Sequence, residues 1–157
     1  MNKIYYTWQH VHQLTDVIAQ KIHNDGWKPD IVVGITRGGL VPAVILSHEF
    51  GNILETINIS LRDNLNQTDQ HLQKIINYAI TGYKVLIVDD INDTGATIEC
   101  IRDQLGAQSN IRIAVLTNNV SSNSQVDYWG TQINKHQDPS WIVYPWEQGG
   151  QSCHITC

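Results

Sequence analysis

Residues 84–98 read KVLIVDDINDTGATI, and this stretch decides how the rest of the chain is interpreted. It begins with an unbroken apolar run, Val85 to Val88, which is short and rich enough in β-branched residues to be a strand buried on both faces. Two adjacent acids, Asp89 and Asp90, end the run, and a turn of small residues leads into a helical pattern over 97–104. The stretch therefore predicts the central strand of a parallel sheet, with paired carboxylates at its carboxyl end.

The turn after the acids is suited to binding an anion. Small residues let backbone N–H groups converge on an anion at the start of a helix, where the helix macrodipole also favours negative charge. Carboxylates beside such a phosphate cradle make sense if a ligand with hydroxyl groups, or a divalent metal, lies between them. Because open α/β sheets bind ligands at the carboxyl ends of their strands, we expect phosphate on 94–97 and hydroxyls or Mg²⁺ on Asp89 and Asp90.

Other interpretations of these residues were open. Asp93-Thr94-Gly95 is the triplet of aspartic proteases, but those enzymes need a second triplet in an all-β setting, and here a helical pattern follows a parallel strand. Walker-type magnesium sites require a G-x-x-x-x-G-K-[ST] loop, which is missing from the 157 residues. The acids could also simply cap the next helix, although one or two would be enough for that role.

A second strand, glycine turn and helix pattern occurs over residues 31–50. Glycines let backbone N–H groups approach a phosphate closely, and the planar guanidinium of Arg37 matches phosphate oxygens. Taken alone, Gly38-Gly39 would be an ordinary tight turn with Arg37 in water. Beside the first turn, we interpret residues 36–39 as a second anion site.

The remaining patterns alternate between helix and strand. Helical spacing is found over 7–22 and 71–79, and strand patterns over 54–60, 111–116 and 125–133. Residues 61–70 are polar without apolar periodicity, which indicates a mobile loop, and residues 148–157 read as a surface tail. We therefore expect a single α/β domain, residues 1–157, with a mostly parallel sheet flanked by helices.

Composition excludes several classes of protein. With 41% hydrophobic and 16% charged residues, the chain reads as globular, and its net charge of −5 argues against a broad nucleic-acid surface. No signal-peptide core or membrane-spanning run is found, so a cytoplasmic location is expected. Cys100, Cys153 and Cys157 are expected to be reduced thiols, with a tail metal clip that includes His154 as the alternative.

Three segments resemble one protein family. VLIVDDINDTGAT resembles the phosphoribosyl-pyrophosphate (PRPP) signature of type I phosphoribosyltransferases, and ITRGGLVPA resembles the pyrophosphate loop of the bacterial and archaeal xanthine-guanine enzymes. The run from Trp141 to Glu147 resembles the W-I-x-x-P-W-[DE] purine hood of the same enzymes, in which a flat indole suits stacking on a base. The chain is thus identified as similar to purine phosphoribosyltransferases.

The resemblance implies a reaction and a set of site residues. It implies transfer of the 5-phosphoribosyl group from PRPP to guanine, xanthine or hypoxanthine in purine salvage, with Mg²⁺, and a homodimer or homotetramer. It implies a flexible flap near 61–70 and a small C-terminal hood near 125–147. The implied residues are Asp93 as the catalytic base; Asp89, Asp90, Asp93, Thr94, Gly95, Ala96 and Thr97 for PRPP; Thr36, Arg37, Gly38 and Gly39 for pyrophosphate; Asn118, Trp141 and Ile142 for the base; and Asp89 and Asp90 for the metal.

The chain departs from the family pattern at two places. The Ser-Tyr pair common in related flaps is Ser60-Leu61, with Thr68 where a basic residue is expected, and Asn118 replaces a lysine that contacts the 6-oxo group of the purine. An Asn amide can donate to that oxygen but can also accept from an amino group. A phosphoribosyltransferase for another base, and a regulatory protein that senses PRPP or nucleotides on the same fold, are therefore the alternatives.

Overall fold

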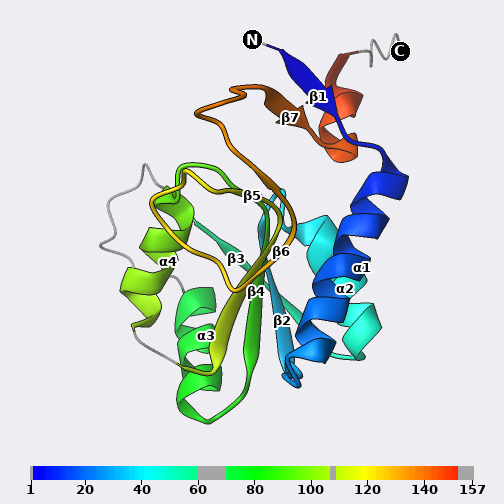
Figure 1. Cartoon of the computed structure of the whole chain (residues 1–157). Helices are drawn as coiled ribbons and strands as arrows, with labels where there is room; N and C mark the ends of the chain where they lie inside the picture. The colour runs from blue at the N-terminus through cyan, green and yellow to red at the C-terminus, as the bar shows by residue number, and fades with distance from the viewer. Residues whose placement is uncertain (1, 60–69, 107–108, 152–157) are drawn as a thin grey trace, which may run out of the picture.

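Five parallel strands form the main sheet, and β4 lies at its centre (Figure 1). The computed structural model describes residues 2–59, 70–106 and 109–151. The strand order is β3-β2-β4-β5-β6, and every neighbouring pair is parallel. The strands are β2 (Ile31–Thr36), β3 (Ile53–Asn58), β4 (Val85–Asn92), β5 (Ile111–Asn119) and β6 (Tyr128–Ile133). The predicted α/β class, with a mostly parallel sheet flanked by helices, is confirmed.

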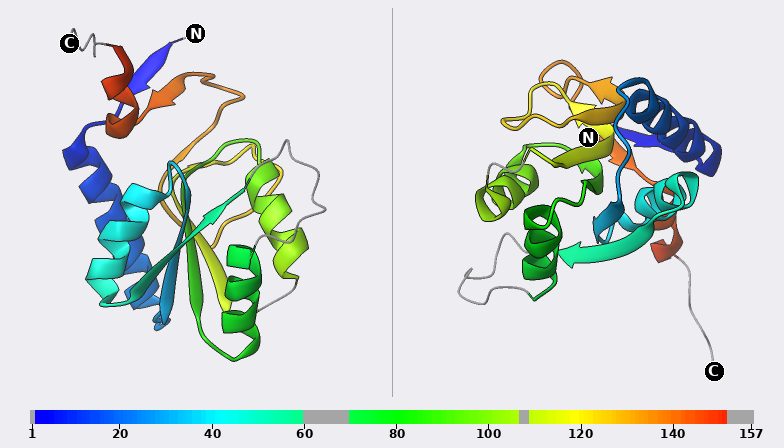
Figure 2. Two further views of the ribbon diagram at one scale, coloured as in Figure 1. Left: turned by 180° about the vertical axis from the view of Figure 1, so that it is seen from behind. Right: turned by 90° about the horizontal axis from the view of Figure 1, so that it is seen from below.

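Helices cover both faces of this sheet (Figure 2). One apolar cluster joins α1 and α2 to the sheet through residues such as Val11, Leu46 and Leu86, and a second joins α3 and α4 through Ile75, Ile87 and Ile98. Side chains of β4 alternate between these clusters, which is why its apolar run is unbroken in the sequence. The helices are α1 (Trp8–Asn24), α2 (Leu40–Phe50), α3 (Gln70–Ile80) and α4 (Ala96–Leu105).

The strand β4 is longer than its apolar run. Pairing with β5 continues past the predicted end of the strand, through Asp89 with Val115 and Asn92 with Asn118. The expectation that the acids follow the strand was therefore wrong by a few residues, because backbone pairing does not depend on apolar side chains. As a result, Asp89 and Asp90 are held by the sheet itself, which fixes their positions more firmly than a turn would.

A second, two-stranded parallel sheet lies beyond the main sheet (Figure 1). It pairs β1 (Lys3–Tyr5) with β7 (Trp141–Val143), and a 3₁₀ helix, η1 (Pro145–Gln151), follows β7. The sequence pattern did not predict β1, which is too short to show periodicity. The range predicted for the hood is divided, since β6 belongs to the main sheet and β7 to the small one.

Some predictions fall outside the described residues. Of the predicted flap, only Gln70 is described, as the first residue of α3, and the tail residues Cys153, His154 and Cys157 are not described. Cys100 is a free thiol, as expected. Among the described helices, none has the length and apolar character needed to cross a membrane.

Candidate active site

The turn between β4 and α4 leaves the start of α4 open to an anion. Gly95 precedes the helix with φ of 97°, a left-handed conformation that a residue with a side chain rarely adopts. No side chain caps this helix end, although Thr94 Oγ1 accepts a hydrogen bond of 3.3 Å from the N–H of Ala96. Thr94, Ala96 and Thr97 are accessible to solvent, so the start of α4 is open at the turn for which phosphate binding is predicted.

The loop between β5 and β6 supports this turn. A Cβ at Gly95 would lie 2.7 Å from the backbone nitrogen of Ser124, so glycine is required sterically as well. The side chain of Asn92 is buried and donates to Asn118 Oδ1 and to the carbonyl of Ser124, both at 2.8 Å. Its own oxygen accepts from Ser122 Oγ at 2.9 Å. Sequence reasoning missed these supporting residues, because they lie in a segment without any recognisable pattern.

The second predicted anion loop, residues 36–39, packs directly against β4. A Cβ at Gly38 would lie 2.0 Å from Asp90 Oδ2, and one at Gly39 would lie 2.2 Å from the carbonyl oxygen of Val88. Both glycines are therefore required by close approach to the acidic strand. The peptide bond between Thr36 and Arg37 is cis, and the Arg37 side chain is exposed. The structure thus brings the two predicted loops to the same pair of acids.

Burial and neighbouring negative charges raise the pKa values of both acids. Burial, reinforced by the neighbouring Asp90 charge, raises the pKa of Asp89 well above its usual range. Burial is also the main reason that the pKa of Asp90 is raised to about 6, and the nearby Glu147 carboxylate adds to this. In the described part of the chain, neither acid has a cationic side chain within ion-pair distance. This arrangement favours a bound cation or hydroxyl donors.

Asp93 is held beside a lysine that sequence reasoning did not single out. Lys135 Nζ donates to Asp93 Oδ2 at 2.7 Å. The buried side chain of Asn119 links the two backbones, since its Nδ2 donates to the carbonyl of Asp93 at 2.9 Å and its Oδ1 accepts from the N–H of Lys135 at 3.1 Å. Lys135 lies in the connection between β6 and β7, far from Asp93 in the sequence, so no local pattern could have predicted the pair.

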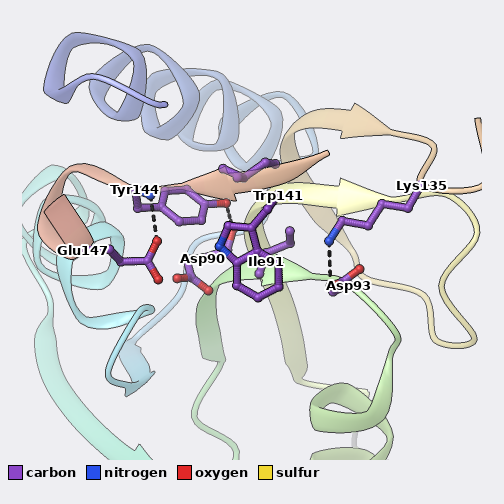
Figure 3. Close-up of a pocket in the computed structure, with 8 residues that line it drawn as sticks. Asp90, Ile91, Asp93, Lys135, Trp141, Tyr144 and Glu147 are labelled. Atoms are coloured by element: carbon purple, nitrogen blue, oxygen red, sulfur yellow. Dashed lines mark hydrogen bonds and ion pairs between the residues drawn. The ribbon is translucent and has the colours of Figure 1, made fainter. Parts of the chain in front are cut away.

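Asp93 and Lys135 line a pocket beneath β7 (Figure 3). The pocket has a volume of about 300 Å³, including space open to solvent. It brings two of the predicted base-contacting residues, Trp141 and Ile142, together with Asp93, the predicted catalytic base. Its lining consists of Asp90, Ile91, Asp93, Lys135, Trp141, Ile142, Tyr144 and Glu147.

Tyr144 fixes the small sheet over the main one. Its hydroxyl lies 2.9 Å from the carbonyl oxygen of Asp90 and 3.0 Å from Thr117 Oγ1, and its ring stacks on Trp146 with centroids 4.8 Å apart. Its backbone N–H donates to Glu147 Oε2 at 2.8 Å. Burial raises the pKa of Tyr144 well above its usual range, so the hydroxyl stays protonated and able to donate. The pocket roof is therefore tied to the acidic strand.

The structure does not bring Asn118 to this pocket. Its carboxamide oxygen accepts the hydrogen bond from Asn92, and its side chain lines a separate pocket of about 690 Å³ with Ser122, Ser124 and Trp129.

No group of three or more potential metal ligands is found in the described residues. The described residues therefore do not form a complete cage of protein ligands for a metal.

These features, two glycine loops around paired acids at the carboxyl end of a central parallel strand, define a phosphoribosyl-binding class of site. The phosphoribosyl transferase domain family matches residues 1–151, and the chain belongs to this family. A xanthine-guanine phosphoribosyltransferase from Cereibacter sphaeroides is 32% identical over 156 residues, covering 92% of this chain and 87% of the relative.

Solved structures are similar over nearly the whole chain. A purine phosphoribosyltransferase from Pyrococcus horikoshii is 30% identical with a TM-score of 0.69, covering 94% of this chain and 95% of its own. A protein from Neisseria gonorrhoeae, solved with bound ppGpp, is 25% identical with a TM-score of 0.75, covering 93% of this chain and 89% of its own. The fold of this chain is thus similar to that of a purine phosphoribosyltransferase of known structure.

Proposed function

We propose that this protein transfers the 5-phosphoribosyl group from PRPP to a 6-oxopurine, which is guanine, xanthine or hypoxanthine, and releases pyrophosphate. The observation that carries the proposal is the position of the pocket beneath Trp141, directly beside two anion loops that share the acids of β4. A substrate with phosphates at two points of a ribose, next to a flat base, fits this arrangement. The purine enzymes among the relatives support the same assignment.

The two loops divide the phosphates of PRPP between them. The uncapped start of α4, residues 94–97, holds the 5′-phosphate through backbone N–H groups and the two threonine hydroxyls. Residues 36–39 receive the pyrophosphate, with the exposed guanidinium of Arg37 free to turn toward its oxygens. Residues 36–39 pack against β4 and residues 94–97 follow it in the chain, so the two loops hold the two ends of the substrate on either side of the acids.

Asp89 and Asp90 bind the ribose hydroxyls, either directly or through Mg²⁺. The residues fit this ion, because Mg²⁺ is commonly held by one or two carboxylates together with substrate oxygens rather than by a cage of protein ligands. Burial raises the pKa values of both carboxylates, and no cation of the described residues pairs with them, which supports a bound metal ion. When bound, Mg²⁺ would offset the charge that develops on the leaving pyrophosphate.

Asp93 acts as the base of the reaction. As N9 of the purine bonds to C1′ and the bond from C1′ to the pyrophosphate oxygen breaks, Asp93 accepts the proton from N7. Trp141 stacks on the purine, and the backbone near Ile142 contacts its edge. The carboxylates near C1′ also stabilise the positive charge that develops on the ribose in the transition state.

Nucleotide formation tests this proposal. The purified protein would be given PRPP and Mg²⁺ with guanine, xanthine, hypoxanthine, adenine or uracil in separate reactions, and products would be separated by chromatography. We expect a nucleoside monophosphate and pyrophosphate in equal amounts with at least one 6-oxopurine. Formation of product from uracil or adenine alone would overturn the assignment to 6-oxopurines, and no product from any base would overturn the transferase.

A second candidate is a nucleotide-sensing protein on the same fold. It is favoured by the ppGpp bound to the similar protein from Neisseria gonorrhoeae. Under this function, the two anion loops would hold the two phosphorylated ends of one nucleotide and no turnover would follow. Saturable binding of ppGpp by a protein that forms no nucleotide from any base would favour it over the transferase.

A further inference from the structure

Lys135 is the one cation among the described residues that line the pocket, and three carboxylates, those of Asp90, Asp93 and Glu147, belong to the same lining. Its side chain is only 17% exposed, and its ammonium lies 2.7 Å from Asp93 Oδ2 and 5.4 Å from the ring centroid of Trp141. Figure 3 shows the lysine reaching Asp93 from the side of the pocket. The ammonium therefore stands where a base stacked on Trp141 would present its edge.

The position of the pair is fixed by the backbone rather than by the ion pair. Asn119 is 6% exposed, and its carboxamide holds the carbonyl of Asp93 and the N–H of Lys135 at the same time. This clamp leaves the ammonium and the carboxylate themselves free to separate. The side-chain contact can thus open without any movement of the chain.

The ion pair between Lys135 and Asp93 opposes the role of Asp93 as the base of the proposed reaction. A carboxylate oxygen that accepts from an ammonium is less available to accept a proton from the base. The ammonium leaves Asp93 readily only if another acceptor replaces the carboxylate, because a half-buried charge without a partner is costly. An oxo group on the purine is such an acceptor, whereas an amino group at the same place is a second donor.

We propose that Lys135 selects the base by exchanging Asp93 for the oxo group of a 6-oxopurine, an inference that rests on the proposed function. With an oxopurine bound, the ammonium donates to the oxo oxygen, and Asp93 is released to take the N7 proton while Lys135 keeps all of its own protons. With an aminopurine, the ammonium remains on Asp93 and the base is neither held nor deprotonated. The resemblance assigns the contact with the oxo group to position 118, but in the structure the side chain of Asn118 bonds to Asn92 and lines a separate pocket.

Equilibrium binding of IMP and AMP tests the selection without any turnover. The two nucleotides share the 5′-phosphate and ribose and differ in the 6-oxo or 6-amino group, so their affinity ratio isolates the base edge. Calorimetric titrations would compare the wild type with Lys135→Met, and with Lys28→Met as the control, since Lys28 is an exposed lysine just before β2. We expect the wild type to bind IMP at least about tenfold more tightly than AMP, as a hydrogen bond from a charged donor implies.

In Lys135→Met, the IMP to AMP ratio should fall to within about threefold of unity, because the charged hydrogen bond is removed. Lys28→Met should keep the wild-type ratio, and Lys135→Arg should restore part of it. A wild-type ratio near unity, or a ratio unchanged in Lys135→Met, would overturn the selection. If Lys135→Met is unfolded, as judged by its melting curve, Lys135→Gln replaces it with the same expected loss of preference.

The proposed transferase function and the proposed selection of the base by Lys135 can each be refuted without refuting the other. A wild type that forms no nucleotide from any base refutes the transferase, whereas the IMP to AMP ratio still reads the contact of Lys135 with the base edge. A wild type that forms nucleotide with a ratio unaffected by Lys135→Met supports the transferase and refutes the selection.

Discussion

The phosphate side of the site and its base side are built in different ways. The phosphate side, residues 36–39 and 89–97, consists of two continuous segments, each of which includes the end of a strand of the main sheet and the turn after it. The base side, the pocket of Asp93, Lys135 and Trp141, collects residues from the end of β4, from the connection after β6 and from β7. One side is therefore set by local chain geometry, and the other by how distant segments pack.

This difference implies that changes on the phosphate side should affect PRPP, and changes on the base side should affect the base. Asp93 lies where the two sides meet, because it directly follows β4 and also lines the pocket. Variants of single residues can therefore show whether the two sides act separately.

The largest effect is expected from Asp93→Asn. An amide cannot accept the N7 proton, and general base catalysis contributes about 10²–10⁴-fold, so kcat should fall by that factor. The dissociation constant for PRPP should change by less than about threefold, because the phosphate loops are untouched. Rapid-quench turnover and calorimetry measure the two quantities, and equal losses in both would show that Asp93 binds PRPP rather than acting as the base.

Gly38→Ala should weaken the phosphate side selectively. A Cβ there would lie 2.0 Å from Asp90 Oδ2, so either the Asp90 carboxylate or the loop must shift from its position. Such overpacking costs about 1–3 kcal/mol, which corresponds to a roughly 5–150-fold loss of PRPP affinity. Gly82→Ala, at a glycine with open space around it, is the control for general loss of stability. Unchanged PRPP binding in Gly38→Ala would contradict the role of this loop.

Low pH should also weaken the binding of PRPP on the phosphate side. The pKa of Asp90 is about 6 against an ordinary value of 3.8, so below pH 6 this carboxyl takes up a proton and loses its attraction for a cation. Affinity for PRPP with Mg²⁺ should then fall up to about tenfold per pH unit below 6, while Asp90→Asn should bind weakly and keep only the pH dependence that comes from Asp89, whose pKa is also raised by burial. Binding titrations from pH 5 to pH 8 (roughly one unit below to two units above that pKa) measure the change in affinity.

The same shift predicts a change in stability. Because the folded-state pKa of Asp90 is raised, the charged carboxylate destabilises the free protein once the pH exceeds about 6, and this penalty fades as the pH falls toward 3.8. Asp90→Asn should therefore raise the melting temperature at pH above 6 and much less near pH 4, whereas Asp16→Asn on the exposed face of α1 should do neither. A lower melting temperature of Asp90→Asn above pH 6 would contradict the assignment.

The smallest effect is expected from Tyr144→Phe. It removes the hydroxyl that lies near the Asp90 carbonyl and Thr117, at a cost of about 1 kcal/mol or somewhat more. The loosened pocket roof should raise KM for the base a few-fold and leave KM for PRPP unchanged. Steady-state kinetics with each substrate varied separately measures this, with Tyr83→Phe at an exposed position as the control.

Sequence reasoning succeeded best on the phosphate side. The sheet, the helices and the placement of residues 36–39 and 94–97 at the acids could all be predicted, because each depends on a strand, a glycine turn and a helix that are adjacent in the chain. Only the extent of β4 was wrong, since pairing with β5 carries it through Asp89 and Asp90.

The base side could be predicted only in part. Trp141 and Ile142 were identified from a resemblance, but the pairing of β7 with β1 and the clamp of Asn119 on Asp93 and Lys135 have no local pattern. The side chain of Asn118, assigned to the base from its place in the chain, bonds to Asn92 instead. Contacts between distant segments depend on packing, which spacing in the sequence does not encode.

One measurement tests the separation of the two sides most directly: KM for PRPP and KM for the base, determined in Gly95→Ala and in Trp141→Leu. Gly95→Ala places a Cβ 2.7 Å from the Ser124 nitrogen at a left-handed residue, so KM for PRPP should rise while KM for the base stays within about twofold. Trp141→Leu removes a stacking surface worth about 1–3 kcal/mol and should do the reverse. If both variants raise both constants together, the two sides do not act separately and the account is wrong.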